Sequence, residues 1–177
     1  MKYRDAIAYQ CGKLAKNGKT IFIGYNTVCG SRMYHTLDGV PTSQCIETPV
    51  AENLMMGLAM GMSLEGYRPV VCFERTNFLW AAADAIRHHL CMLPRLSGGQ
   101  FDFPVVLRAI AGDNKPLDPG PQHTAGDAES FALACNLDYV MCDTLYEIKQ
   151  AYARARTTKS PLMIIEYKRE YNQGPRG

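Results

Sequence analysis

The sequence predicts an α/β fold in which a mostly parallel sheet is covered by helices on both faces. Short apolar runs such as 20–24 and 162–166 recur along the chain, and they are typical of strands buried on both sides. Longer segments with helical spacing separate these runs, and Gly, Pro, Asn or Asp marks many of the boundaries. Strands that alternate with helices in this way form parallel sheets.

The first half of the chain is expected to open with a helix over 3–16, ended by Asn17-Gly18, and a buried strand over 20–24. Scattered Gly, Ser, Thr, Asp and Pro predict a loop over 25–44, and loops of this length inside compact domains are usually functional. The pattern then predicts a strand near 45–46, a helix over 50–64, a strand over 69–73 and a helix over 78–92.

The second half continues the alternation around a Gly- and Pro-rich loop over 111–126. Its expected elements are a strand over 104–108, a helix over 128–135, a strand over 139–142, a helix over 145–156 and a strand over 162–166. Residues 1–171 are thus expected to form one domain, followed by a flexible tail over 172–177. The loops at 25–44, 74–77 and 111–126 all follow strands, so they should gather at the sheet edge where ligands bind.

Composition favours a small-molecule role. The chain has 177 residues and 47% hydrophobic content, which is enough for one full core. Its 19 basic and 17 acidic residues give a net charge of +2, and this offers no electrostatic case for nucleic acid or an anionic membrane. The seven cysteines include no Cys-x-x-Cys pair, and the polar amino terminus has no apolar signal core. We therefore expect reduced thiols in a cytoplasmic protein.

Glu52 is the most informative single residue. It stands at the start of the apolar helix expected over 50–64, where removing a carboxylate from water is costly. It could serve the chemistry of a site, or it could simply complement the helix dipole. From the residues alone these two interpretations are about level.

Several motifs that occur in order along the chain favour a role for Glu52 in the chemistry of a site. The run Thr48-Pro49-Val50-Ala51-Glu52 leads into Gly57-x-x-x-Gly61, and Gly66-Tyr67-Arg68-Pro69 and Asn77-Phe78 follow. Together they resemble the pyrimidine-binding domain of thiamine diphosphate enzymes, above all the beta subunit of the pyruvate and branched-chain 2-oxo acid dehydrogenases. The middle domain of transketolase is a more distant likeness. The resemblance covers nearly the whole chain and implies the thiamine diphosphate-binding fold of the pyrimidine-domain type.

The resemblance implies how the cofactor is held. Glu52 corresponds to the catalytic glutamate that hydrogen-bonds N1′ of the aminopyrimidine, and Phe78 to the aromatic residue that packs on this ring. Phe73 is expected to contribute to cofactor binding, with Trp80 as a further wall of the pocket. Aromatic residues in such a stretch are, however, more often plain core.

His123 is the second catalytic candidate. Gln122-His123-Thr124 resembles the Gln-His-Ser of the dehydrogenase beta subunits, where the histidine faces the substrate. An imidazole there can move protons near neutral pH. Without the resemblance, a loop histidine beside Gly and Pro is more often simply solvated. His88-His89 is expected to have a surface or packing role, and Arg32 with His35 either meets an anionic substrate or lies in solvent.

The metal-binding half of the family's site is not recognisable here. The family binds a divalent metal through Gly-Asp-Gly and later asparagines, whereas Gly112-Asp113-Asn114 and Gly126-Asp127-Ala128 lack this continuation. No metal ligand is expected in this chain. The resemblance implies a separate, alpha-type subunit that brings the diphosphate and Mg²⁺, in a heterotetramer with the cofactor at the interface. The sequence also lacks the family's carboxy-terminal domain, which favours an enzyme outside the large dehydrogenase complexes.

The reaction class follows from the cofactor. We expect decarboxylation of a 2-oxo acid, or transfer of an acyl or two-carbon ketol unit, by this chain with its partner. The alternative is a catalytically silent subunit that keeps the fold and only stabilises or regulates a partner. An unrelated nucleotide-binding protein is disfavoured because the sequence has no phosphate-cradling glycine loop.

Overall fold

The computed structural model describes residues 1–114 and 118–171; the tail predicted over 172–177 lies outside them. Within these residues, six strands form one sheet in the order β2-β1-β3-β4-β6-β5, and every neighbouring pair is parallel. The predicted α/β fold with a parallel sheet is therefore confirmed. The strands are β1 (Thr20–Gly24), β2 (Cys45–Glu47), β3 (Arg68–Phe73), β4 (Val106–Ala111), β5 (Asp138–Cys142) and β6 (Leu162–Tyr167).

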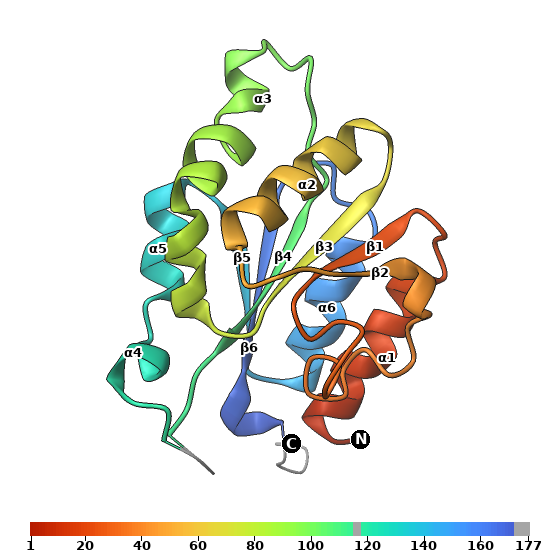
Figure 1. Ribbon diagram of the computed structural model, residues 1–177, viewed down its shortest axis with the longest axis vertical. Coiled ribbons are helices and arrows are strands. Elements are labelled where there is room, and N and C mark those ends of the chain that lie inside the picture. Colours follow the sequence, from red (N-terminus) through yellow and green to blue (C-terminus); the bar gives the residue numbers. More distant parts are fainter. Residues whose placement is uncertain (115–117, 172–177) are drawn as a thin grey trace.

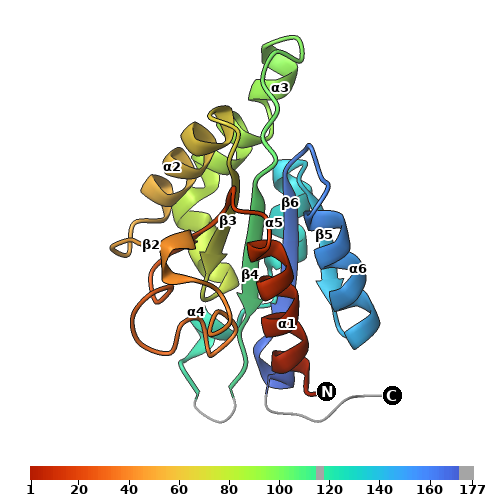
Figure 2. The same ribbon diagram turned by 90° about the vertical axis from the view of Figure 1, so that its right-hand side faces the viewer.

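Helices cover both faces of the sheet, as Figures 1 and 2 show. One face packs against α2 (Glu52–Leu64), η2 (Thr76–Ala82), η3 (Ala85–Leu90) and α5 (Ala128–Cys135), and the other against α1 (Tyr3–Ala15) and α6 (Leu145–Ala155). Four short helices complete the described chain: η1 (Thr42–Gln44), α3 (Leu93–Leu96), α4 (Pro121–Thr124) and η4 (Lys168–Glu170). The short α3 and α4 lie toward opposite ends of the molecule (Figure 1).

The pleat of the strands divides the core into two clusters. In β3, Val71 and Phe73 face the α2 side, whereas Val70 and Cys72 face α1 and α6. All four side chains are buried, which explains why the strands appear in the sequence as continuous apolar runs.

The single helix predicted over 78–92 is wrong in its form. The chain winds as a 3-10 helix over Thr76–Ala82 and as a π-helix over Ala85–Leu90. Buried side chains are three apart in the first part (Leu79, Ala82, Ala85) and then four apart (Ile86, Leu90). Leu79, Ala82, Ile86 and Leu90 would also share one face of a uniform α-helix, so the apolar spacing predicts a helix here but not how tightly it is wound.

The remaining differences concern boundaries and loops. The strand predicted over 104–108 runs over Val106–Ala111, and the loop predicted over 25–44 ends in a 3-10 turn at Thr42–Gln44. Inside this loop, the four consecutive residues 32–35 all have positive φ angles between 46° and 67°. This is one left-handed turn of non-glycine residues, a strained backbone that only surrounding contacts can maintain.

A buried ion pair joins two neighbouring strands. In β4, Arg108 donates from Nε and Nη2 to the two carboxylate oxygens of Glu166 in β6, both at 2.8 Å, and both side chains are fully buried. The hydroxyl groups of Tyr152 and Tyr171 also donate to this carboxylate. Arg108 Nη2 donates further to Thr36 Oγ1 at 2.7 Å, so the pair also binds the 25–44 loop.

Removing one partner of this pair should be costly. We expect Arg108→Met to lower the free energy of unfolding by about 3–5 kcal/mol, because the Glu166 carboxylate would stay buried without its cation. Urea denaturation measures this change. The matched control is Arg154→Met, which breaks an exposed pair with Asp138 and should cost about 0–1 kcal/mol. Equal losses for the two variants would contradict the expectation.

Candidate active site

Three of the four predicted site residues lie on segments that leave the carboxyl ends of β2, β3 and β4. Glu52 begins α2 after β2, Phe78 lies in η2 after β3, and His123 lies in α4 after β4. Both α2 and α4 contact η2. Because the strands are parallel, the fold brings these segments together at one sheet edge, as expected for a ligand site of an α/β protein.

An aromatic row runs along this edge. The Phe78 ring stands edge-on to His123, with 5.5 Å between ring centroids, and edge-on to Tyr25, with 6.1 Å between centroids. Asn77 Oδ1 lies 3.1 Å from His123 Nδ1. Phe78 and His123 are half-buried, so both rings keep surface for a ligand. Neither Tyr25 nor Asn77 was foreseen as a site residue; Tyr25 comes directly after β1, and Asn77 stood only in the Asn77-Phe78 motif.

Glu52 lies beside this row with its hydrogen-bonding capacity unused. Its side chain is 7% exposed and makes no hydrogen bond or ion pair within the described chain. Thr48 Oγ1, in the same motif, is buried and also has no partner there. Burial raises the pKa of Tyr25, and the carboxylates of Glu52 and Glu74 raise it further. Buried polar atoms without partners fit a polar ligand, such as an aminopyrimidine, that would bond to them.

Phe73 and Trp80, expected at the cofactor pocket, each pack against other parts of the chain. Phe73 is 0% exposed in the core on the α2 side, so its ring supports the site from behind and has no face free for a cofactor. The predicted part of Phe73 in cofactor binding stays a prediction, in which the ring acts from behind the site, because the pleat of β3 turns the side chain to the α2 side of the core. Trp80 donates from Nε1 to Asp127 Oδ2 at 2.6 Å and stands edge-on to Phe131, which ties η2 to α5.

The other basic and histidine candidates have local partners. Arg32 donates to the carbonyl oxygens of Thr27 and Val40, so its guanidinium group holds the 25–44 loop together. His35 contacts Asp38 at 3.1 Å in an exposed position. His88 contacts Asp84 one turn away, also exposed, which agrees with the predicted surface role of that pair.

Glu47 fixes the start of the 25–44 loop, a role that the sequence did not reveal. Its carboxylate, at the end of β2, accepts backbone N–H bonds from the four consecutive residues 26–29 at 2.6–3.3 Å. Burial acts in the opposite direction, but the N–H groups of Val28, Asn26 and Cys29 lower the pKa of Glu47. The side-chain amide of Asn26 in turn donates to Glu74, which follows β3.

Lys168 is a second residue that the sequence did not single out. It follows β6, and its Nζ lies 2.8 Å from the centroid of the Tyr34 ring and 5.2 Å from that of Tyr171. Burial, and next the neighbouring Arg75 cation, lower the pKa of Lys168 to about 8. A cation over the face of an aromatic ring is favourable. The pKa of Lys168 is lowered all the same, so burial and the Arg75 charge outweigh this contact with Tyr34.

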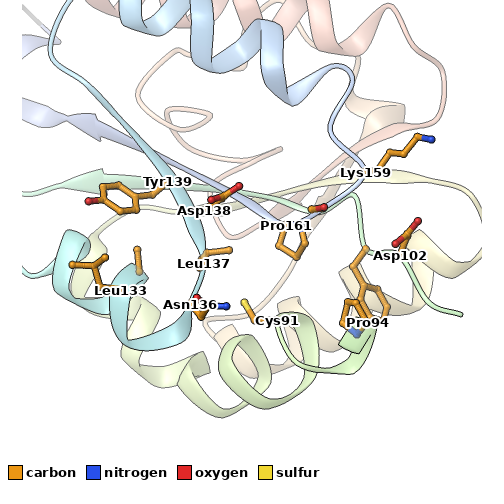
Figure 3. Close-up of a pocket in the computed structure, with 13 residues that line it drawn as sticks. Cys91, Pro94, Asp102, Leu133, Asn136, Leu137, Asp138, Tyr139, Lys159 and Pro161 are labelled. Carbon is orange, nitrogen blue, oxygen red and sulfur yellow. The ribbon is translucent and has the colours of Figure 1, made fainter. Parts of the chain in front are cut away.

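A sizeable cavity lies away from the carboxyl edge of the sheet. It has a volume of about 510 Å³ and opens beside the amino-terminal ends of β5 and β6, among Cys91, Pro94, Leu137, Asp138 and Lys159 (Figure 3). A second cavity, of about 210 Å³, lies near the amino-terminal ends of β1 and β3. The residues of the carboxyl edge line neither cavity. The unused polar groups, more than the cavities, therefore identify the candidate site.

Residues 1–114 and 118–171 contain neither a metal-binding cluster nor a membrane-spanning helix. No group of three or more His, Cys, Asp or Glu side chains is placed there to hold a metal ion. None of the helices within these ranges combines the length and apolar character needed to cross a membrane.

Comparison with known proteins identifies the family. Residues 1–173 match the family model described as transketolase, pyrimidine binding domain, and the chain belongs to this family. Its curated relatives include the pyruvate dehydrogenase E1 component subunit beta of Cyanidium caldarium, 33% identical over 127 residues. The subunit beta-4, chloroplastic, of Oryza sativa subsp. japonica is also 33% identical over 127 residues. These matches cover 72% of this chain but only 38% and 31% of the relatives.

A solved structure confirms the fold. The chain superposes with a TM-score of 0.74 on a protein titled split gene transketolase, inactive beta4 tetramer. The superposition covers 95% of this chain and 52% of the other, at 17% sequence identity. The predicted resemblance to dehydrogenase beta subunits and to transketolase is thereby confirmed.

The lowered pKa of Lys168 predicts a pH effect on stability. Between pH 8 and 10 the unfolded chain binds more protons at this side chain than the folded chain does, so Lys168 makes stability rise with pH in that window. We expect Lys168→Met to remove this rise, as measured by urea unfolding at several pH values. Lys159→Met, at the opposite sheet edge, is the matched control. Parallel pH curves for wild type and Lys168→Met would contradict the prediction.

Proposed function

We propose that this chain is the pyrimidine-binding subunit of a split thiamine diphosphate enzyme. With a separate diphosphate-binding subunit, it would catalyse decarboxylation of a 2-oxo acid or transfer of an acyl or ketol unit. The observation that carries the proposal is the Glu52 carboxylate, which has no hydrogen-bond partner within the described residues and acts electrostatically on Tyr25, in one aromatic row with Phe78 and His123. Membership of the transketolase pyrimidine-binding family supports it.

Each residue has a definite task in this proposal. Glu52 hydrogen-bonds a ring nitrogen of the aminopyrimidine and exchanges a proton with it. Phe78 packs on the ring, and Tyr25 behind it keeps water away. His123 moves a proton on the substrate side. When bound, the cofactor supplies the nucleophilic carbon needed to cleave or form a bond next to a carbonyl group.

Half of this site would come from a partner. Glu52, Phe78 and His123 line neither described cavity, which suits an edge that a second protein covers. We propose that an alpha-type subunit binds the diphosphate and Mg²⁺, in a heterotetramer. The curated relative is named as a pyruvate dehydrogenase subunit beta, and the similar solved structure as an inactive beta4 tetramer of a split gene transketolase. We accordingly expect this chain alone to be inactive.

The outer face of α2 suits contact with that partner. Val50, Leu54 and Leu64 are exposed large apolar side chains, and Gly57 and Gly61 are exposed between them. Leu54, Gly57, Gly61 and Leu64 lie along one stripe of the helix, and Val50 lies just before its start. Small residues in such a stripe let another helix approach closely, and Glu52 begins the same helix. The cofactor site and the subunit contact would then share one element.

A reducing compartment such as the cytoplasm is also part of the proposal. All seven cysteines are free thiols, and four of them are buried. Reduced thiols suit a reducing compartment. One relative is named as chloroplastic, so fractionation of the native cell would distinguish the cytoplasm from an organelle.

The cofactor assignment can be tested by calorimetry and turnover. Thiamine diphosphate with Mg²⁺ should bind to the chain mixed with the diphosphate-binding subunit encoded nearest to it, and much more weakly to the chain alone. We expect Glu52→Gln to reduce turnover of 2-oxo acids or ketose phosphates by at least about 100-fold with the assembly intact, because it removes the proton-exchanging group. Glu65→Gln, at the exposed end of α2, is the matched control.

The outcomes separate the candidate functions. No binding to the mixture would contradict the cofactor assignment for that pair of chains. Binding without turnover in the wild type would favour the catalytically silent subunit. Equal turnover in wild type and Glu52→Gln would remove Glu52 from the catalytic role.

The exposed apolar face of α2 predicts that a charged substitution there weakens assembly with the partner. Leu54→Lys should weaken assembly with the partner at least tenfold, because a charge would be buried in an apolar contact. Sedimentation velocity of the mixed chains measures this. The control is Leu133→Lys, an equally exposed leucine on α5. Assembly that Leu54→Lys leaves unchanged would place the interface elsewhere.

A further inference from the structure

We propose that Asn77 is a positioning residue that fixes the tautomer of His123 and makes Nε2 the nitrogen that exchanges protons. This inference rests on the proposed function, because it specifies how His123 would act at that site. Its basis is the contact between Asn77 Oδ1 and His123 Nδ1, 3.1 Å apart and partly buried. The two residues are 46 positions apart in the chain and meet only through the fold.

The contact determines where the proton sits on the ring. In this orientation of the Asn77 amide, Oδ1 faces the ring, and because an amide oxygen can only accept a hydrogen bond, His123 Nδ1 carries the hydrogen. A neutral imidazole has one N–H group, and Nε2 is then the bare, basic nitrogen. An imidazole in water without a partner at Nδ1 prefers the opposite tautomer. Asn77 therefore reverses the intrinsic preference of the ring.

The imidazole is held on two further sides. The Phe78 ring stands edge-on to it at 5.5 Å between centroids. The backbone of His123 lies so close to Gly112, just after β4, that a Cβ at Gly112 would be 1.7 Å from the His123 carbonyl oxygen. Only glycine permits this approach. Nε2 is the ring nitrogen left without a hydrogen-bond partner in the described chain.

An amide suits a ring that must gain and lose a proton. When Nε2 takes a proton, Nδ1 remains a donor, so the bond to Asn77 is kept in both charge states. The ring can then cycle without turning. A carboxylate at position 77 would also accept this bond, but it would favour the charged imidazolium and raise the pKa of the histidine. Asn77 orients the ring without adding that bias.

The first test needs no activity. Long-range ¹H–¹⁵N NMR of the histidine-labelled chain reports which ring nitrogen carries the hydrogen above the histidine pKa, with His123→Ala assigning the signals. We expect the Nδ1–H tautomer in the wild type and in Asn77→Asp, and a shift to Nε2–H in Asn77→Ala. The control is Asn17→Ala, which removes an amide oxygen that binds the backbone N–H of Lys19 at the opposite edge. An Nε2–H tautomer in the wild type, or no change in Asn77→Ala, would overturn the proposal.

The second test uses the assembled enzyme with thiamine diphosphate and Mg²⁺. We expect Asn77→Ala to lower kcat about 100-fold with little change in KM, which is the scale of one general acid–base contribution. Asn77→Asp should restore part of this loss, with the pH–rate profile moved to higher pH. In the His123→Ala background, Asn77→Ala should cost nothing more, because its effect passes through the imidazole.

Additive losses in the double variant would show that Asn77 acts independently of His123, and would overturn the positioning role.

The proposed function and the role of Asn77 can fail independently of each other. If the wild-type assembly turns over no substrate while NMR finds Nδ1–H, the proposed function fails and the role of Asn77 in fixing the tautomer is supported. If the assembly is active and NMR finds Nε2–H, the function stands and the inference about Asn77 is overturned.

Discussion

The buried pair of Arg108 and Glu166 is the interaction on which the architecture of the site depends. It joins β4 to β6 in the middle of the sheet, and two tyrosine hydroxyls complete the coordination of the carboxylate. The same guanidinium group donates to Thr36 Oγ1, which lies in the long loop after β1. A fully buried charge persists only when its partners are held in place. One interaction therefore ties the stable core of the sheet to a loop of the candidate active site.

That loop is strained, and its contacts explain how the strain persists. The left-handed turn at 32–35 costs about 1–2 kcal/mol for each residue. Arg32 ties the turn to backbone carbonyls, buried Met33 anchors it in the core, and Thr36 connects it to Arg108. The turn holds Tyr34 against the amino group of Lys168. Backbone strain of this kind gathers at functional sites, where the surrounding fold over-determines it.

The carboxyl edge combines order with unused bonding capacity. Glu47 fixes four consecutive backbone N–H groups, and Asn77 fixes one side of the His123 ring. Glu52 and Thr48 Oγ1, by contrast, have no partners within the described residues. An edge that is rigid but unsatisfied is preorganised for a ligand, because little ordering remains to be done on binding. This arrangement suits a site that a cofactor and a second subunit complete together.

The sequence alone determined the parallel α/β fold, most element boundaries and the family, because apolar periodicity and short motifs such as Thr48-Pro49-x-x-Glu52 are local properties of the chain. The tertiary structure decided what depends on register between distant segments. Arg108 meets Glu166 across 58 positions and Asn77 meets His123 across 46, which no local pattern encodes. The pleat of β3 turned Phe73 into the core, whereas the sequence could only place an aromatic residue near the site.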